Sequence, residues 1–539
     1  MKKGKIEESG GKRFISGVFV LSFSTLIVKV IGLAFKIPML SILGMEGMGY
    51  FNSAYEIYAM LCVISTAGLP VALSILVSAA RAREDALAIK GIYRSALRIF
   101  FIFGAFGSAF MLLFAKRLAM SIGNDEAYYC IMAIAPALFF ICLASAVRGY
   151  CQGFEEMKPT AISQLIEAIA KLALGIIFAL AALRQGYPVP AVAAFAVLGI
   201  TVGTFLSLCY LMIARRKVNK KIIASLNGDT NTKKEENVKT LLKIALPITL
   251  GSAVISLTRI LDMAFIMRRL QDIGISSFRS NEIYGAYTTL ALPVFGLIPS
   301  LITPVSMALI PELTGFIERK SLKGQIISVE RAIRLTTLFA MPASLAVTVF
   351  SRQILSLLFK GQNDAIDIAA PLLSLLGASV LFSCLITTTN AILQAYRCVK
   401  LPIFSMSVGV AVKAITSYFL LGSRWVGVYG APIGSLACNV TVVLLNFALM
   451  FRYAGNTAMA INLGKSFVKP FFASVISIGG SFASYSIFAE KFLSETAAFC
   501  IAVAIAVILY CLLVFLLGIM DREDLRMFPI FNKILKEKQ

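Results

Sequence analysis

The sequence predicts an all-α polytopic membrane protein with fourteen transmembrane helices, built as two parallel six-helix lobes and two further C-terminal helices. Three observations support this fold class. Of the 539 residues, 58% are hydrophobic and 15% are charged, and the mean hydropathy is +0.85, far above that of soluble globular domains. Long apolar segments recur along the whole chain. Basic residues gather in every second loop between those segments.

The apolar segments are long enough to cross about 30 Å of hydrocarbon, which takes roughly 20 helical residues. We predict fourteen spans, at residues 14–40, 50–79, 99–115, 127–147, 159–182, 190–213, 244–267, 284–311, 335–351, 367–389, 402–421, 428–451, 470–489 and 496–520. The first segment is too long for a signal peptide and lacks a small-x-small cleavage site. We therefore expect it to remain as the first transmembrane helix.

The positive charge of the chain, formally +23, follows the predicted topology. With both termini in the cytoplasm, 36 of the 51 basic residues fall in cytoplasmic segments and 10 in outer loops. This bias sets the orientation of a multi-pass membrane protein. The anionic inner leaflet thus explains the basic charge, and we expect no nucleic-acid partner. The remaining five basic residues lie inside predicted helices: Lys29, Lys36, Lys171, Arg259 and Lys413.

An internal repeat suggests how the helices are grouped. Residues 140–171 align with residues 382–413 at an offset of 242, and "QGFEEMK" (152–158) then matches "QAYRCVK" (394–400). The offset equals six helices, which preserves orientation and implies parallel lobes. We predict an N-terminal lobe at residues 1–213, a cytoplasmic linker at 214–243, a C-terminal lobe at 244–451, and two final helices with a cytoplasmic tail at 452–539.

The chain carries no convincing enzyme motif, so we predict no catalytic residues. "GMEGMG" (44–49) follows no strand and reads as a tight turn. "LGKSF" (463–467) resembles the end of a phosphate-binding loop, but Met459 occupies the place of its first glycine. The ten cysteines form no C-x-x-C pair and the chain has no histidine, so we expect no metal site and no resident cofactor.

Lys29 and Lys36 stand out because charge is costly inside a membrane-spanning helix. Seven residues apart, they share one helix face and lie roughly 10 Å apart along the axis. Lys29 either lines a polar cavity or has a structural partner. Lys36 either lines the same cavity or extends its side chain to the outer interface.

The other membrane charges have possible partners on their own helices. Glu167 and Lys171 are spaced i, i+4, and Arg259 and Asp262 are spaced i, i+3. Each pair either neutralises itself or serves ion coupling, for which the acids Glu56, Glu167 and Asp262 are the candidates.

Counting every interior charge leaves an excess of cations over acids, which favours an anionic substrate such as a phosphate or diphosphate. The candidate substrate-binding residues are therefore basic or polar. They are Lys29, Lys36, Arg259, Lys413, Gln152, Gln394 and Asn390. The three amides either contact sugar hydroxyls or join helices by hydrogen bonds.

Several stretches resemble the multidrug, oligosaccharidyl-lipid and polysaccharide exporter superfamily. The most specific is "RGYCQGFEEMKPTAISQ" (148–164), joined by "STLIVKVIGLAFKIPML" (24–40), "GLPVALSILVS" (68–78) and "MALIPEL" (307–313). Within that superfamily the chain is similar to the polysaccharide-biosynthesis branch, which includes stage V sporulation protein B and the lipid II flippases.

The resemblance implies a functional monomer in the bacterial plasma membrane. It would move an undecaprenyl-diphosphate-linked saccharide from the inner to the outer leaflet by alternating access, and the implied substrate is the peptidoglycan precursor lipid II. The driving ion, Na⁺ or H⁺, stays open. Lys29 occupies the position where lipid II flippases have an arginine, which implies that it binds the diphosphate. Where those flippases carry an Arg-Asp pair, this chain has Phe35 and Lys36. The alternatives are a cation-coupled multidrug exporter of the same superfamily and a non-transporting protein of spore or envelope assembly.

Overall fold

The computed structural model describes residues 2–83, 85–222, 236–398, 400–453, 455, 462–491 and 494–519. Within these ranges the protein is built from helices and short turns, and no strand is present. Contacts divide the chain into two compact units, residues 1–289 and 290–539. Each unit is described by itself.

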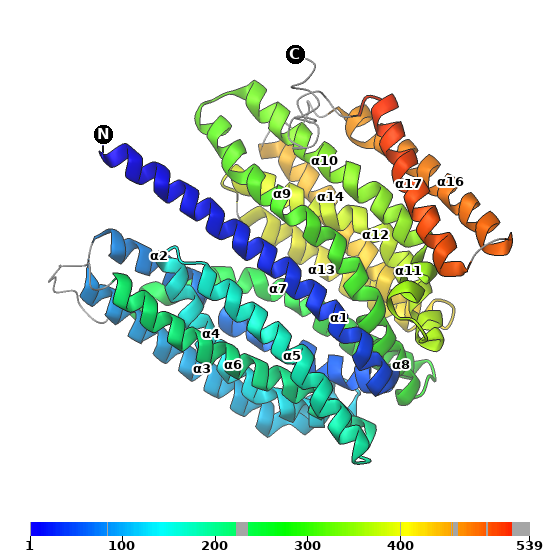
Figure 1. The fold of residues 1–539 in the computed structure, drawn as a ribbon, viewed down its shortest axis with the longest axis horizontal. Coiled ribbons are helices and arrows are strands. Elements are labelled where there is room, and N and C mark those ends of the chain that lie inside the picture. The colour runs from blue at the N-terminus through cyan, green and yellow to red at the C-terminus, as the bar shows by residue number, and fades with distance from the viewer. Residues whose placement is uncertain are drawn as a thin grey trace. The chain divides into compact units, whose positions relative to one another are not determined.

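The first unit has eight helices in the part that the structure describes. They are α1 (Lys2–Thr66), α2 (Leu69–Ala82), α3 (Ala86–Ser121), α4 (Tyr128–Gly153), α5 (Lys158–Arg184), α6 (Val189–Ile222), α7 (Glu236–Asp272) and α8 (Ser277–Ala286). Figure 1 shows α3 to α6 lying side by side; α4 packs against both α3 and α6, and α5 packs against α6 and α1. We call these four helices the frame, and α1 packs against all four of them.

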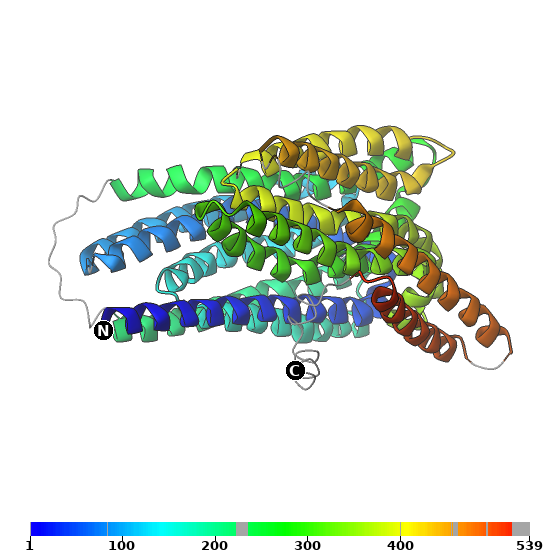
Figure 2. The same ribbon diagram turned by 90° about the horizontal axis from the view of Figure 1, so that it is seen from above.

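The second unit begins in the π-helical turn Tyr287–Ala291. Its described helices are α9 (Leu292–Glu318), α10 (Leu322–Val349), α11 (Ser351–Leu358), α12 (Asn363–Ala395), α13 (Lys400–Leu421), α14 (Gly430–Tyr453), α16 (Lys469–Lys491) and α17 (Glu495–Leu516). The central helix is α12, which packs against α9, α10 and α14. The last two helices, α16 and α17, lie side by side as a pair (Figure 2).

The first two predicted spans differ from the helices that form. α1 runs through the predicted gap at residues 41–49 and bends at Gly44, whose φ of 66° is a left-handed value that glycine adopts without strain. The predicted helix 50–79 is wrong at one place, because it is interrupted at Ala67–Gly68. A Cβ at Gly68 would overlap the carbonyl oxygen of Ala245. Pro70, which lacks an N–H, lies in the first turn of the next helix, where proline is common.

Twelve stretches of the described residues are long and apolar enough to cross a membrane. One of them, Ile27–Arg81, covers most of the predicted spans 14–40 and 50–79. The predicted span 244–267 falls inside α7 (Glu236–Asp272), which is not among the twelve. The all-α polytopic fold is therefore confirmed, while the count of fourteen spans stays a prediction.

The boundary between the two compact units falls between residues 289 and 290, after the predicted linker. α7 packs against α1, α2 and α3, and α8 packs against α1, so both helices cluster with the first unit. Residues 223–235 of the linker and residues 520–539 of the predicted tail lie outside the described residues. The lobe boundaries at residues 213, 243 and 451 stay a prediction.

The repeat predicted from the sequence reappears in the backbone. Glu155, after α4, has φ 63°, and Arg397, which is 242 residues later and follows α12, has φ 61°. The amide of Glu155 donates to the Gln152 carbonyl at 2.9 Å, and that of Arg397 to the Gln394 carbonyl at 2.9 Å. The next amide donates five residues back in both places. Both helices thus end in the same Schellman motif, with a side chain at the position that glycine usually occupies.

Candidate functional site

Charged side chains from three helices of the first unit interact with one another. Four of them are basic, Lys29, Lys36, Lys171 and Arg259, and one is the acid Glu56; we call these five residues the cation cluster. Lys29, Lys36 and Glu56 lie on α1, Lys171 lies on α5 and Arg259 lies on α7. Arg259 is close enough to repel Lys29 and Lys36 and to attract Glu56. The bend at Gly44 separates the two lysines from Glu56 along α1. The cluster is thus assembled by tertiary structure.

Two members of the cluster are open to their surroundings. Lys29 is exposed, and the Arg259 side chain is 60% exposed. The guanidinium of Arg259 lies 4.0 Å from the carboxylate of Glu56, whose side chain is 16% exposed. A pair at this distance is loose. Lys29 and Arg259 therefore present positive charge that an incoming anion can reach.

Lys36 is held by the backbone. Its Nζ donates to the carbonyl oxygen of Thr288 at 2.6 Å, in the π-helical turn Tyr287–Ala291. The Asn52 amide donates to the hydroxyls of Thr288 and Thr289, at 2.9 Å each. Lys36 thus has a hydrogen-bond partner inside the protein that is distant in the sequence, and this bond connects the first half of α1 to the turn that follows α8.

Lys171 lies too far from Glu167 for a direct ion pair in the structure, although the carboxylate still attracts it, and the pairing of the two stays a prediction. Its Nζ lies 5.0 Å from the ring centre of Phe35, 5.8 Å from that of Phe51 and 4.8 Å from that of Tyr55. Aromatic faces attract a cation through their quadrupole. Because Phe35 precedes the bend of α1 and the other two rings follow it, Lys171 links α5 to both halves of α1.

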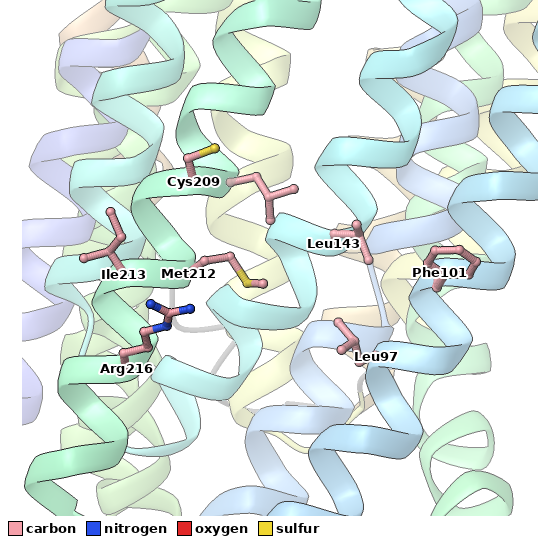
Figure 3. A pocket seen from close by; sticks show the side chains of 8 residues that line it. Leu97, Phe101, Leu143, Cys209, Met212, Ile213 and Arg216 are labelled. Carbon is pink, nitrogen blue, oxygen red and sulfur yellow. The ribbon is translucent and has the colours of Figure 1, made fainter.

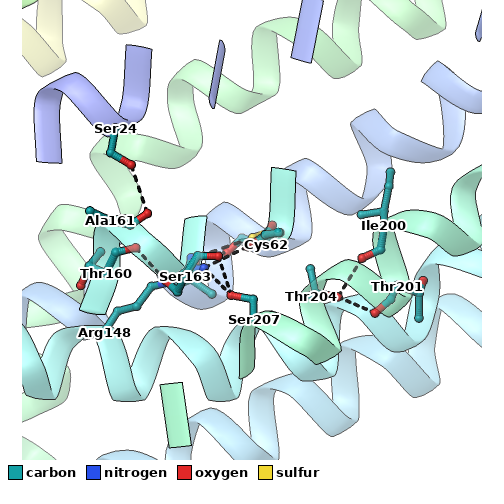
Figure 4. Close-up of polar contacts among 12 residues, drawn as sticks. Ser24, Cys62, Arg148, Thr160, Ala161, Ser163, Ile200, Thr201, Thr204 and Ser207 are labelled. Carbon is teal, nitrogen blue, oxygen red and sulfur yellow. Dashed lines mark hydrogen bonds and ion pairs between the residues drawn. The ribbon is translucent and has the colours of Figure 1, made fainter. Parts of the chain in front are cut away.

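Glu167 pairs instead with Arg148, a residue that the sequence analysis missed. Arg148 donates to the Ser163 hydroxyl at 3.0 Å and to the Ser207 hydroxyl at 3.1 Å (Figure 4). It also donates to the Glu167 carboxylate at 2.9 Å. The prediction ended the helix at residue 147 and left Arg148 in a loop, whereas α4 continues to Gly153. The available signal was Ser163 and Glu167 at i, i+4, which place a polar strip on α5.

The pairing of Arg259 with Asp262 also stays a prediction. The ion pair of Arg259 in the described part of the chain is with Glu56. Asp262 is buried on α7, at 8% exposure. Among the described residues, no group of three or more His, Cys, Asp or Glu side chains is placed to hold a metal ion.

Sequence comparison identifies the family to which this arrangement belongs. Residues 14–316 match the family described as "Polysaccharide biosynthesis protein", and residues 247–419 match the family MatE. The chain belongs to the polysaccharide biosynthesis protein family. This confirms the superfamily predicted from the sequence, whose members are membrane transporters and not enzymes.

Two proteins of Bacillus subtilis (strain 168) are similar in sequence to this chain. Stage V sporulation protein B is 24% identical over 97% of this chain and 99% of its own length. Lipid II flippase MurJ is 24% identical over 82% of this chain and 83% of its own length.

Solved structures share the fold. A structure of lipid II flippase MurJ in an inward closed conformation has a TM-score of 0.71 at 15% identity, over 93% of this chain and 98% of that chain. An inward-facing multidrug resistance MATE family transporter of the MOP superfamily has a TM-score of 0.62 at 16% identity, over 80% of this chain and 98% of that chain.

The other predicted substrate-binding residues are described within their own units. Gln152 donates to the Thr160 hydroxyl at 3.5 Å in the first unit. In the second unit, Lys413 is buried on α13, Gln394 is exposed near the end of α12, and Asn390 accepts from Asn446 at 2.8 Å. Of the seven predicted substrate-binding residues, the structure brings Lys29, Lys36 and Arg259 into one cluster.

Proposed function

We propose that this family member is a flippase that moves an undecaprenyl-diphosphate-linked saccharide, lipid II, from the inner to the outer leaflet by alternating access. The observation that carries the proposal is the cation cluster. Lys29, Lys36, Lys171 and Arg259 outnumber Glu56 and the nearby Asp262 on membrane helices of one unit. Excess cations on membrane-spanning helices are expensive in a bilayer and are retained where an anion binds.

The diphosphate suits the two exposed cations. Lys29 supplies a point charge on a flexible stem, and Arg259 supplies a planar fork that binds two phosphate oxygens at once. Because Arg259 is only loosely held by Glu56 at 4.0 Å, a diphosphate draws the guanidinium away at small cost. Glu56 is then free to take up the coupling ion, Na⁺ or H⁺.

The names of two relatives support this choice of substrate. MurJ of Bacillus subtilis is named a lipid II flippase, and it aligns with 82% of this chain. Stage V sporulation protein B aligns over 97% of this chain, which supports a role in envelope synthesis during sporulation. Gln152, Gln394, Asn390 and Lys413 are proposed to contact the glycan or the phosphates at other stages of the cycle. We propose that the protein works as a monomer with both termini in the cytoplasm.

The test is lipid II flipping in proteoliposomes. The fraction of lipid II that an added, membrane-impermeant cleaving enzyme reaches is followed over time for the wild type, Lys29→Ala, Lys29→Arg and Arg259→Ala. We expect the wild type to expose the inner-leaflet pool, Lys29→Arg to retain most of the rate, and the two alanine variants to fall at least tenfold, since each loses a charge-assisted contact with phosphate.

Arg397→Ala is the matched control, because Arg397 is exposed and paired with Glu318 at a helix end. Its rate should equal that of the wild type. An unchanged rate in Lys29→Ala rejects the role of Lys29. No flipping by the wild type, with a loss of sporulation when the gene is deleted, favours the non-transporting assembly protein.

A cation-coupled multidrug exporter is the second candidate, favoured by the match of residues 247–419 to the MatE family. Ethidium efflux from cells that express the protein separates the two candidates. Efflux that depends on Glu56 and is insensitive to Lys29→Ala favours the exporter, since a cationic drug is repelled by the cation cluster.

A further inference from the structure

A groove on the first unit lies away from the cation cluster and shares no residue with it. It encloses about 500 Å³ between α3 and α6 (Figure 3). Leu97 and Phe101 of α3 form one side, Met212 and Ile213 of α6 the other, and Leu143 of α4 lies between them. The volume falls within the roughly 300–1,000 Å³ of small-molecule sites.

The walls of the groove are apolar and face outward. Phe101 is 53% exposed, Met212 43% and Ile213 57%. On helices that cross a membrane, exposed apolar side chains contact lipid chains. The groove is therefore a recess in the lipid-facing surface, shaped by side chains of three helices.

One end of the groove carries positive charge. Arg216, one turn after Met212 on α6, lines the groove and is exposed. Arg94 precedes Leu97 by three residues, so it lies on the same face of α3, and it is exposed too. Neither arginine has an ion-pair partner among the residues that the structure describes. Under the predicted orientation this end lies at the inner leaflet, where anionic headgroups concentrate.

We propose that the groove is a binding site for an anionic diacyl phospholipid of the inner leaflet. One acyl chain lies against Phe101, Leu143 and Met212, and the phosphate contacts Arg216. The charge complementarity of the arginine end selects an anionic headgroup over a zwitterionic one. The bound lipid bridges α3 and α6, which both pack on α4, and so braces the frame that supports α1. This site is separate from the proposed lipid II site.

Cys209 makes the proposal testable, because it lines the groove and is exposed. The full-length protein in detergent is treated with N-ethylmaleimide while phosphatidylglycerol or phosphatidylcholine is added, and modification is read for each cysteine by peptide mass spectrometry. We expect phosphatidylglycerol to slow the modification of Cys209 at least fivefold, at concentrations where phosphatidylcholine has little effect. Cys500, exposed on α17 of the second unit, is the internal control and should react at a constant rate.

Arg216→Gln and Lys217→Gln form a matched pair. Both remove one exposed positive charge from α6, but only Arg216 lines the groove. For Arg216→Gln, the phosphatidylglycerol concentration that protects Cys209 should rise about fivefold, because one basic residue near an anionic headgroup strengthens binding by about that factor. Lys217→Gln should need the same concentration as the wild type. Buried Cys151 should stay unreactive in both variants, which shows that they are folded.

Three results would overturn the proposal. Equal protection by the two phospholipids, or an unchanged response in Arg216→Gln, means that the groove takes hydrocarbon without regard to headgroup. Protection by undecaprenyl phosphate at lower concentrations than phosphatidylglycerol assigns the groove to the polyprenyl substrate. The assay measures no transport, so its failure leaves the flippase proposal untouched, and a failed flipping assay leaves this site untouched.

Discussion

The helix triplet α4–α5–α6 of the first unit and the triplet α12–α13–α14 of the second place polar side chains at matching positions but use different chemistry. At the repeat offset of 242, Arg148 corresponds to Asn390 and Ser163 to Ser405. In the first triplet Arg148 donates to Ser163, Ser207 and Glu167. In the second, Asn446 donates to Asn390 at 2.8 Å and to Thr389 at 2.9 Å, and accepts from Ser405 at 2.5 Å.

The comparison teaches that a charged network at this position of the repeat is not required by the fold. A neutral amide joins three helices in the second triplet as completely as an arginine does in the first. Keeping the arginine requires a carboxylate, Glu167, because an unpaired charge in this environment is costly. The repeated lysine differs too: Lys171 lies among the aromatic rings of α1, whereas Lys413 is buried on α13.

The largest expected effect comes from breaking the charged network. Glu167→Gln leaves Arg148 without its carboxylate and should lower the free energy of unfolding by about 2–4 kcal/mol, somewhat less than for a fully buried pair, since the side chains are 13% and 26% exposed. Thermal unfolding in detergent is followed by a thiol-reactive dye, with buried Cys130, Cys142 and Cys151 reporting on the first unit.

The double variant Arg148→Gln/Glu167→Gln is the control, because it removes both charges and resembles the amide network of the second unit. It should recover most of the lost stability. If Glu167→Gln alone unfolds at the wild-type temperature, the ion pair is not what holds the first triplet together.

A smaller effect is expected from breaking the amide network. Asn446→Ala removes three hydrogen bonds from a fully buried site and should cost about 1–3 kcal/mol, because its partners stay buried and unsatisfied. The reactivity of buried Cys384 reports on the second unit. Ser407→Ala, on the exposed side of α13, should change stability by less than about 0.5 kcal/mol. A loss in Asn446→Ala as large as that in Glu167→Gln would remove the distinction between the two networks.

The aromatic contacts of Lys171 should contribute less again. Tyr55→Leu removes the nearest ring, 4.8 Å from the ammonium, and should cost about 1–2 kcal/mol, the range of a partly desolvated cation–π contact. Tyr55→Phe keeps the ring and should stay close to the wild type in the same unfolding assay. Equal losses in both variants would assign the effect to the hydroxyl and not to the ring.

The smallest effect is expected at the Schellman motifs, a feature that the two units share. Glu155 and Arg397 both hold left-handed backbone conformations that favour glycine. The glycine and the alanine variant at each position both lose the native side chain. The difference between their free energies of unfolding therefore measures the cost of the left-handed backbone conformation. Glycine should be more stable than alanine by about 1 kcal/mol at both positions. A difference at one position alone would show that the two Schellman motifs are not equivalent.

Much of the fold was predictable because hydropathy reports directly on the bilayer. α5, α13 and α16 begin and end within two residues of the predicted spans. The interruption at Gly68 was not predicted, since it depends on the close approach of Ala245 from α7. The extension of α4 past Arg148 was missed for a related reason: the charge is tolerated there only because α5 and α6 supply Glu167, Ser163 and Ser207.

The sequence by itself determined the membrane class, the alternation of basic and less basic loops along the chain, the repeat and the excess of cations in the apolar segments, because each is a property of composition or period. Tertiary structure alone decided which charge meets which partner. Spacings of three or four residues make a pair possible, yet Lys36 bonds to a carbonyl 252 residues away and Glu167 to an arginine on another helix. Helix packing decides the partner because a polar group withdrawn from water must bond to whatever the neighbouring helices present, wherever that group lies in the sequence.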